Sequence, residues 1–300
     1  MKNILKNKTA IGFIITLLGG IFWGFSGSCG QYLFTFHTVT SDWLVPIRMV
    51  FSGLILLLIC AVKNKKKIFI VWHGKKNILT MAAFTLLGLV MCQYSYFRAI
   101  EFSNAGVATV LQYLSPAMIL AFTCVKDRRA PKAFEIVAII LAIGGTFFIA
   151  AGGAENMTLS PKALFWGLAA AVFLVCYTLI PAPLLKISDT PTILGWGMLI
   201  GGICMLPIFR PWEIMPEISL SLILALGGVI IFGTVIAYSF FLEGVHLIGA
   251  SKASIISSIE PVSATVISAL WLKTAFMPTD FIGFAMIIST IFIISVKAKK

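Results

Sequence analysis

The sequence predicts an all-α membrane protein in which ten transmembrane helices form two inverted five-helix repeats around a central cavity. The first observation is the composition: 59% of the 300 residues are hydrophobic, 11% are charged, and the mean hydropathy is +1.02. A soluble domain has about 25% charged residues because its surface faces water. The composition therefore excludes a cytosolic enzyme, a secreted domain and a disordered chain, and it indicates a lipid bilayer.

The second observation is a series of ten apolar runs separated by charged residues, prolines or glycines. A bilayer core about 30 Å thick needs roughly 20 apolar residues per helix. The first run is longer than the apolar region of a signal peptide and lacks a small-residue cleavage site, so we expect it to be a mature span. The spans are expected at residues 11–33, 42–62, 78–100, 105–125, 134–152, 163–185, 192–209, 219–241, 250–272 and 280–296.

The basic residues indicate how the spans are oriented. The formal net charge is +12, and most Lys and Arg lie near the two termini or in the second-to-third and fourth-to-fifth connections. The loops of the opposite side hold only Lys162, Arg210 and Lys273. Cytoplasmic loops carry the excess of positive charge, so we expect a cell-membrane protein with both termini in the cytoplasm. The charge is thus an orientation signal, and no nucleic-acid partner is expected.

The third observation is internal repetition. Pro116 and Pro261 are 145 residues apart, and the triplet that begins at Phe22 recurs at Phe165. The repeats are therefore expected at residues 1–153 and 154–300, with five spans each. Because five is odd, the second repeat enters the membrane from the opposite side, as in transporters with inverted repeats.

The chain resembles the EamA branch of the drug/metabolite transporter superfamily over almost its whole length. The residues that carry this resemblance are Arg48, the run from Tyr96 to Ile100, and Ile259-Glu260-Pro261. The family often has Leu-Gly-Glu after the fourth helix of each half, whereas this chain has Val125-Lys126-Asp127 and Leu272-Lys273-Thr274. The resemblance implies export or exchange of small metabolites by alternating access.

Glu260 is the principal candidate site residue because an ionisable group near the middle of a span is costly and needs a function. Ser257 lies on the same helical face, and the 145-residue offset maps Ser257 and Glu260 onto Gln112 and Ser115. The two polar faces are expected to meet across the cavity. Glu260 would bind a cationic substrate group or a proton; alternatively, it forms a structural ion pair with Arg48.

Polar and aromatic residues of other spans extend the expected substrate site. Aromatic rings attract organic cations, although core packing or an interfacial belt is the more common reason for any one such residue. The residues expected at the site, besides Glu260, Ser257, Gln112 and Ser115, are Arg48, Gln93, Tyr96, Tyr238, Trp23 and Tyr177.

These features favour a secondary transporter of a small organic metabolite, such as an amino acid or a cationic or zwitterionic compound, coupled to a proton or a counter-substrate. A passive channel, a lipid scramblase and an intramembrane enzyme remain the alternatives. The sequence has no nucleotide-binding loop, and its cysteines and histidines lack metal-ligand spacing. We therefore expect neither cofactor nor metal, no enzymatic activity, and a monomer in which one chain supplies both repeats.

Overall fold

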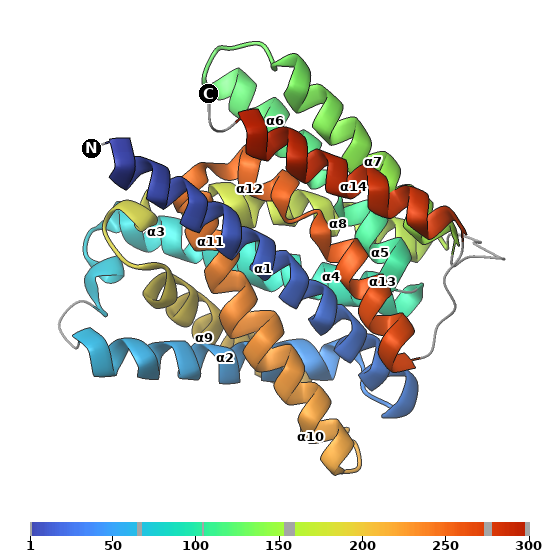
Figure 1. Cartoon of the computed structure of the whole chain (residues 1–300). Helices are drawn as coiled ribbons and strands as arrows, with labels where there is room; N and C mark the ends of the chain where they lie inside the picture. The colour runs from blue at the N-terminus through green and yellow to red at the C-terminus, as the bar shows by residue number, and fades with distance from the viewer. Residues whose placement is uncertain (1, 65–67, 104, 153–159, 273–277, 298–300) are drawn as a thin grey trace.

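Helices are the only regular elements in the part of the chain that the computed structural model describes, residues 2–64, 68–103, 105–152, 160–272 and 278–297 (Figure 1). The first half contains α1 (Lys2–Phe36), α2 (Ser41–Asn64), η1 (Ile70–Trp72), α3 (Lys75–Ala83), η2 (Phe84–Val90), α4 (Met91–Phe102), α5 (Ala105–Gln112), α6 (Ser115–Lys126) and α7 (Ala133–Gly152). The second half contains α8 (Pro161–Leu179), η3 (Leu184–Lys186), α9 (Thr190–Phe209), α10 (Leu220–Gly227), η4 (Gly228–Ile236), α11 (Ala237–Ile248), α12 (Ala250–Ile256), α13 (Ile259–Leu272) and α14 (Pro278–Lys297).

Six helical segments are long and apolar enough to cross a membrane, and the predicted all-helical class is confirmed. These segments are Lys8–Phe36, Ser41–Val62, Lys75–Phe102, Pro161–Lys186, Thr190–Phe209 and Leu220–Ile248. Shorter apolar helices occupy Ser115–Lys126, Ala133–Gly145 and Phe281–Thr290.

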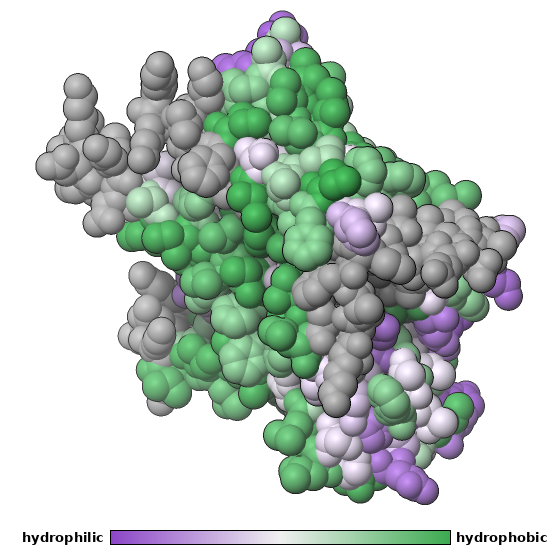
Figure 2. All heavy atoms as spheres, turned by 45° about the vertical axis from the view of Figure 1, so that its right-hand side comes forward, coloured by the Kyte–Doolittle hydropathy of each residue, from purple (hydrophilic) through white to green (hydrophobic). Residues whose placement is uncertain are grey.

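The outer surface is apolar over most of the face drawn in Figure 2, and hydrophilic residues gather toward its margins. Large exposed side chains such as Ile14, Leu58 and Phe165 belong to this surface. Water would disfavour so much exposed apolar area, whereas acyl chains would not.

Two spans are each built from α-helical pieces around a π-helical segment. One joins α3, η2 and α4, and the other joins α10, η4 and α11. In η4 the Thr234 hydroxyl donates to the Val229 carbonyl five residues earlier, at 2.7 Å. Such π segments are uncommon and are frequent at functional sites; here Thr234 of η4 accepts a hydrogen bond from Arg48, which lines the cavity described below.

Two further segments are broken in the middle. The first changes from α5 to α6 at residues 113–114, and the second changes from α12 to α13 at 257–258. Each new helix has a proline in its first turn, Pro116 or Pro261. Because proline has no N–H, the carbonyl four residues earlier loses its helical donor, and the preceding helix ends there.

Glycines let α1 approach α13 beside the second break. A Cβ atom at Gly24 would lie 2.0 Å from the Ser263 Oγ and 2.6 Å from the Ala264 nitrogen, and one at Gly20 would lie 2.9 Å from the Ser257 carbonyl oxygen. Small residues at such crossings are typical of membrane helices. The spacing from Gly20 to Gly24 therefore brings α1 against the break.

The helices pack as a layered bundle in which α2 lies beside α9, α7 beside α14, and α1 beside α11 and α13. The first turns of α1 and the last turns of α14 lie on the same side of the bundle, at the left of Figure 1. The predicted boundary between residues 153 and 154 lies outside the described residues, as do Lys65, Lys66, Lys67, Lys273, Lys299 and Lys300 of the basic loops and ends.

Candidate functional site

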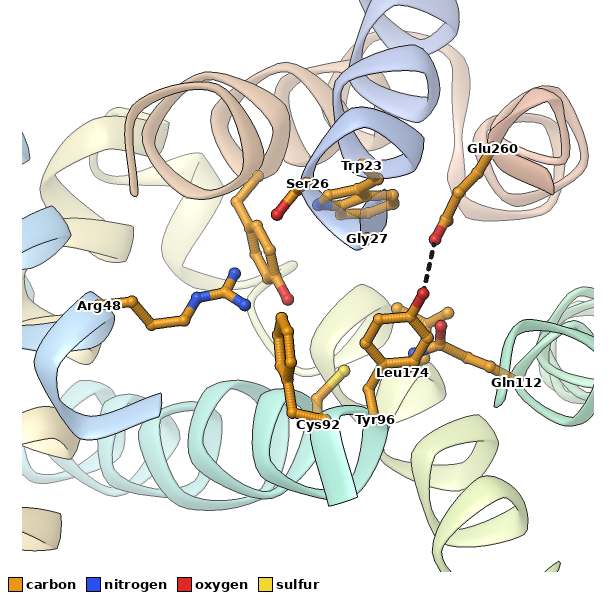
Figure 3. A pocket seen from close by; sticks show the side chains of 11 residues that line it. Trp23, Ser26, Gly27, Arg48, Cys92, Tyr96, Gln112, Leu174 and Glu260 are labelled. Carbon is orange, nitrogen blue, oxygen red and sulfur yellow. Dashed lines mark hydrogen bonds between the residues drawn. The ribbon is translucent and has the colours of Figure 1, made fainter. Parts of the chain in front are cut away.

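A small cavity lined by polar and apolar side chains lies where α1, α2, α4, α5, α8, α11 and α13 meet (Figure 3). Its volume of about 30 Å³ gives room for one or two water molecules and for no organic solute. The cavity in this conformation is therefore too small for a substrate. Its lining residues are Trp23, Ser26, Gly27, Arg48, Cys92, Tyr96, Phe97, Gln112, Leu174, Tyr238 and Glu260.

Glu260 reaches the cavity from the first turn of α13 and is 6% exposed. Its Oε1 lies 3.4 Å from the Tyr96 hydroxyl, the contact dashed in Figure 3, and its Oε2 lies 3.1 Å from the Tyr113 hydroxyl. The N-terminus of a helix carries a partial positive charge that stabilises a carboxylate. The helix break thus creates an N-terminus inside the bundle and places the acid on it.

Tyr113 links the two broken helices. Its hydroxyl lies 2.7 Å from the Ser257 carbonyl oxygen, which is the carbonyl that Pro261 deprives of its helical donor. A tyrosine hydroxyl has one hydrogen to donate. When that hydrogen goes to the Ser257 carbonyl, a protonated Glu260 carboxyl can donate its own hydrogen to the Tyr113 oxygen.

Arg48 faces the cavity from α2 and is 2% exposed. Its Nε and Nη2 donate to the Thr234 hydroxyl at 3.1 and 2.8 Å. Its guanidinium carbon lies 4.7 Å from the centre of the Phe97 ring and 6.0 Å from that of Tyr238. Both rings offer the cation the electrostatic attraction of a π face.

The ion pair between Arg48 and Glu260 that the sequence left open does not form. Arg48 is instead held by Thr234, and Glu260 by two tyrosine hydroxyls. The physical reason is their positions, because Arg48 and Glu260 approach the cavity from opposite walls (Figure 3). Within the described residues, ion pairs occur only at helix ends, where they involve Arg98, Arg129 and Arg210.

Six of the ten predicted site residues line the cavity: Trp23, Arg48, Tyr96, Gln112, Tyr238 and Glu260. The other four are buried nearby without lining it. Ser115 begins α6, Ser257 supplies its carbonyl to Tyr113, and the Tyr177 hydroxyl donates to the Tyr238 carbonyl at 3.0 Å. Gln93 is 1% exposed, and its side-chain amide has no hydrogen-bond partner among the described residues.

Five lining residues escaped the sequence prediction. Ser26 and Gly27 lie three and four residues after Trp23, and Cys92 lies four residues before Tyr96. Helical spacing from the predicted residues therefore carried a signal for these three. Phe97 and Leu174 have no polar group to distinguish them from core residues. The described residues contain no group of three His, Cys, Asp or Glu that could hold a metal ion.

Comparisons with known proteins agree with this architecture. The sequence model of the EamA-like transporter family matches the chain at residues 10–151 and again at 161–296. The chain is 35% identical to a Salmonella typhimurium protein named as an uncharacterized inner membrane transporter, YicL, over 98% of each sequence. It is 26% identical to an uncharacterized Bacillus subtilis transporter, YetK, over 82% of this chain and 75% of that protein. A crystal structure of another protein shares the fold, with a TM-score of 0.76 over 98% of each chain at 17% identity.

Proposed function

The chain belongs to the EamA-like transporter family, and from this premise we propose that it is a secondary active carrier. It would export or exchange a small organic metabolite, such as an amino acid or another cationic or zwitterionic compound, by alternating access. The observation that carries this proposal is the small cavity lined by Glu260, which stands at a mid-bundle helix break. Broken helices that point their ends at a central site are typical of secondary transporters.

Several features support ten spans arranged as two inverted repeats. The family model matches each half of the chain once. The π segments η2 and η4, and the breaks at residues 113–114 and 257–258, recur at nearly the same offset. The packing is reciprocal as well, because α1 contacts α11, α12 and α13 of the second half, while α8 contacts α4, α5 and α6 of the first. A pseudo-twofold axis in the membrane plane would exchange these contacts.

The orientation and assembly follow from the same arrangement. The first turns of α1, the last turns of α14 and the C-terminal end of α2 lie on one side of the bundle (Figure 1). Cytoplasmic loops carry the excess of Lys and Arg, so both termini would face the cytoplasm of the cell membrane. Because one chain supplies both halves of the cavity, the transport unit would be a monomer in the bilayer.

Under alternating access, the small cavity would be one conformation of the transport cycle. A volume of about 30 Å³ cannot hold a metabolite, so the carrier would bind its substrate only after the helices move apart. The described conformation would then be an occluded state between the two open ones. Breaks and π segments provide the irregular backbone at which such bending occurs most readily.

Glu260 would bind the cationic group of the substrate or a coupling proton. Its carboxyl has tyrosine hydroxyls as partners, and no basic side chain of the described residues lies within ion-pair distance of it. The Tyr113 hydroxyl has one hydrogen and lies close to both the Ser257 carbonyl and Glu260. It can donate that hydrogen to a charged Glu260 carboxylate, or donate it to Ser257 and accept a hydrogen from a protonated Glu260. A group with both options can exchange a proton for a substrate cation.

The test is counterflow in proteoliposomes with a panel of radiolabelled amino acids and organic amines. The wild type should give saturable uptake that a trapped counter-substrate accelerates, and Glu260→Gln should reduce it at least about tenfold, because loss of one close charge pair costs about 1.4 kcal/mol or more. Glu243→Gln is the matched control. That carboxyl accepts the Thr190 hydroxyl at 2.6 Å at the end of α11 and does not line the cavity, so uptake should persist.

Two results would count against the proposal. Glu260→Gln uptake with wild-type rate and pH dependence would remove Glu260 from the mechanism. Flux that does not saturate and is not accelerated by counter-substrate would favour a passive channel over a carrier.

A further inference from the structure

Arg48 is a fully buried cation without an acidic partner. No carboxylate of the described residues lies within ion-pair distance of its guanidinium. The group carries five N–H donors and stays charged in proteins, and two of the five go to Thr234. The Thr234 hydroxyl is neutral and spends its own hydrogen on the Val229 carbonyl. Thr234 therefore orients Arg48 without neutralising it.

Burying an uncompensated charge at membrane depth is costly. The rings of Phe97 and Tyr238 lower this cost, because the cation lies 4.7 and 6.0 Å from their centres. A ring face does not supply the opposite charge, however. The cavity wall at Arg48 consequently keeps a positive charge that an anion entering the cavity would meet.

Trp23 lines the same cavity as Arg48 and has an unpartnered donor of its own. Its Nε1 is buried and has no hydrogen-bond acceptor among the described residues, and buried donors are rarely left without one. Edge-on packing against Tyr238, with ring centres 5.2 Å apart, fixes the indole. Figure 3 shows its nitrogen on the side of Arg48, away from Glu260.

We propose that Arg48 and Trp23 form an anion subsite of the cavity, which binds a carboxylate group of the transported solute. A guanidinium matches a carboxylate through two parallel N–H bonds, and the indole N–H adds a third donor from an adjacent helix. This inference rests on the proposed function. It narrows the substrate to a small molecule with an anionic group toward Arg48 and a cationic group toward Glu260.

Cys92 offers a way to test the charge preference of this subsite, because it lines the same cavity. Purified full-length protein is treated with either of two thiol reagents of similar size, the anionic sulfonatoethyl methanethiosulfonate or the cationic trimethylammonioethyl methanethiosulfonate. Peptide mass spectrometry follows the modification of Cys92. The rate of each reagent with free cysteine in solution corrects for intrinsic reactivity.

The anionic reagent should modify Cys92 about tenfold faster than the cationic one after this correction, because buried charge raises the local concentration of the opposite ion by that order. Arg48→Met should abolish the preference, and Arg48→Lys should retain most of it. Trp23→Phe keeps an aromatic ring and removes only the N–H. It should reduce the preference in a protein whose charge is unchanged, which keeps the test decisive if Arg48→Met does not fold.

Equal rates, a preference for the cationic reagent, or no reaction of Cys92 with either reagent would overturn the subsite. This readout does not require transport. Anion preference in a protein that fails the counterflow assay would refute the carrier and leave the subsite intact, whereas counterflow without anion preference would do the reverse.

Discussion

In the N-terminal half, the helix that is broken at residues 113–114 resumes at Ser115, whereas in the C-terminal half the helix broken at 257–258 resumes with Glu260 in its first turn. Both second pieces carry a proline in that turn, and both breaks are buried. Only one of them presents a carboxyl to the cavity. The backbone irregularity is present at both places, while the side chains beside the two breaks differ in chemistry.

The difference extends to the residues at the breaks themselves. Tyr113 occupies the first break and reaches the Ser257 carbonyl and Glu260 in the second. Its counterpart at the offset of 145 is Ser258, whose hydroxyl is buried and has no partner among the described residues. The shorter side chain does not return the contact. The site is therefore one asymmetric unit assembled across two similar breaks.

The largest effect is expected from placing a carboxyl at the first break. Ser115 is 1% exposed and does not line the cavity, so Glu at this position would lack the tyrosine hydroxyls that Glu260 has. Ser115→Glu should lower the free energy of unfolding by about 3 kcal/mol, the cost of an unpaired carboxyl at membrane depth. Unfolding in detergent micelles measures the loss, with Ser115→Ala as a control that should stay within about 1 kcal/mol. Wild-type stability of Ser115→Glu would mean that the two breaks are chemically equivalent.

The helical class could be predicted from the sequence, because apolar length acts locally. The expected spans 105–125 and 250–272 are instead each broken in two beside Pro116 and Pro261. The number of spans has no equally direct signature. Where Pro116 or Pro261 interrupts an apolar run, neither helical piece is long enough to cross a bilayer alone. Reciprocal packing between the halves depends on contacts that no local pattern encodes.

The second effect concerns how closely α1 approaches the C-terminal break. Gly24→Ala should lower the free energy of unfolding by about 1 to 3 kcal/mol, the usual cost of overpacking, because the new methyl would overlap the Ser263 Oγ and the Ala264 nitrogen. Gly27→Ala is the matched control one turn later. There the nearest atom is the Tyr96 hydroxyl at 3.6 Å, an ordinary contact. Thermal unfolding of the two variants in the same detergent compares their stabilities. Equal losses of stability would show that α1 does not approach α13 more closely at Gly24 than it approaches its neighbour at Gly27.

The residues that line the cavity could be predicted only in part from the sequence. Glu260, Arg48 and Gln112 are polar residues in apolar runs, and each lines the cavity as expected. Ser115 and Tyr177 are also polar, yet they face neighbouring helices. Which face of a span turns inward depends on tertiary packing, because a helix in lipid can bury more than one face. The alternative prediction of an ion pair between Arg48 and Glu260 was wrong for the same reason. Arg48 bonds to Thr234 instead, which lies in a π segment that shifts the register of its helix.

The smallest effect on stability, and the sharpest one on function, is expected at Tyr113. Tyr113→Phe removes a hydroxyl that bonds to the Ser257 carbonyl at 2.7 Å and touches Glu260, and Tyr177→Phe removes one that bonds to the Tyr238 carbonyl at 3.0 Å. Each loses one buried hydrogen bond, so each should lower the free energy of unfolding by about 1 kcal/mol. Counterflow measured from pH 5 to 8 should separate the two variants, because of these two tyrosines Tyr113 contacts the carboxyl proposed to exchange a proton and Tyr177 does not. Tyr113→Phe should shift the pH dependence of uptake, and Tyr177→Phe should leave it unchanged. If both variants or neither shift it, the contact between the two breaks has no part in coupling, and the asymmetry at residue 113 concerns packing alone.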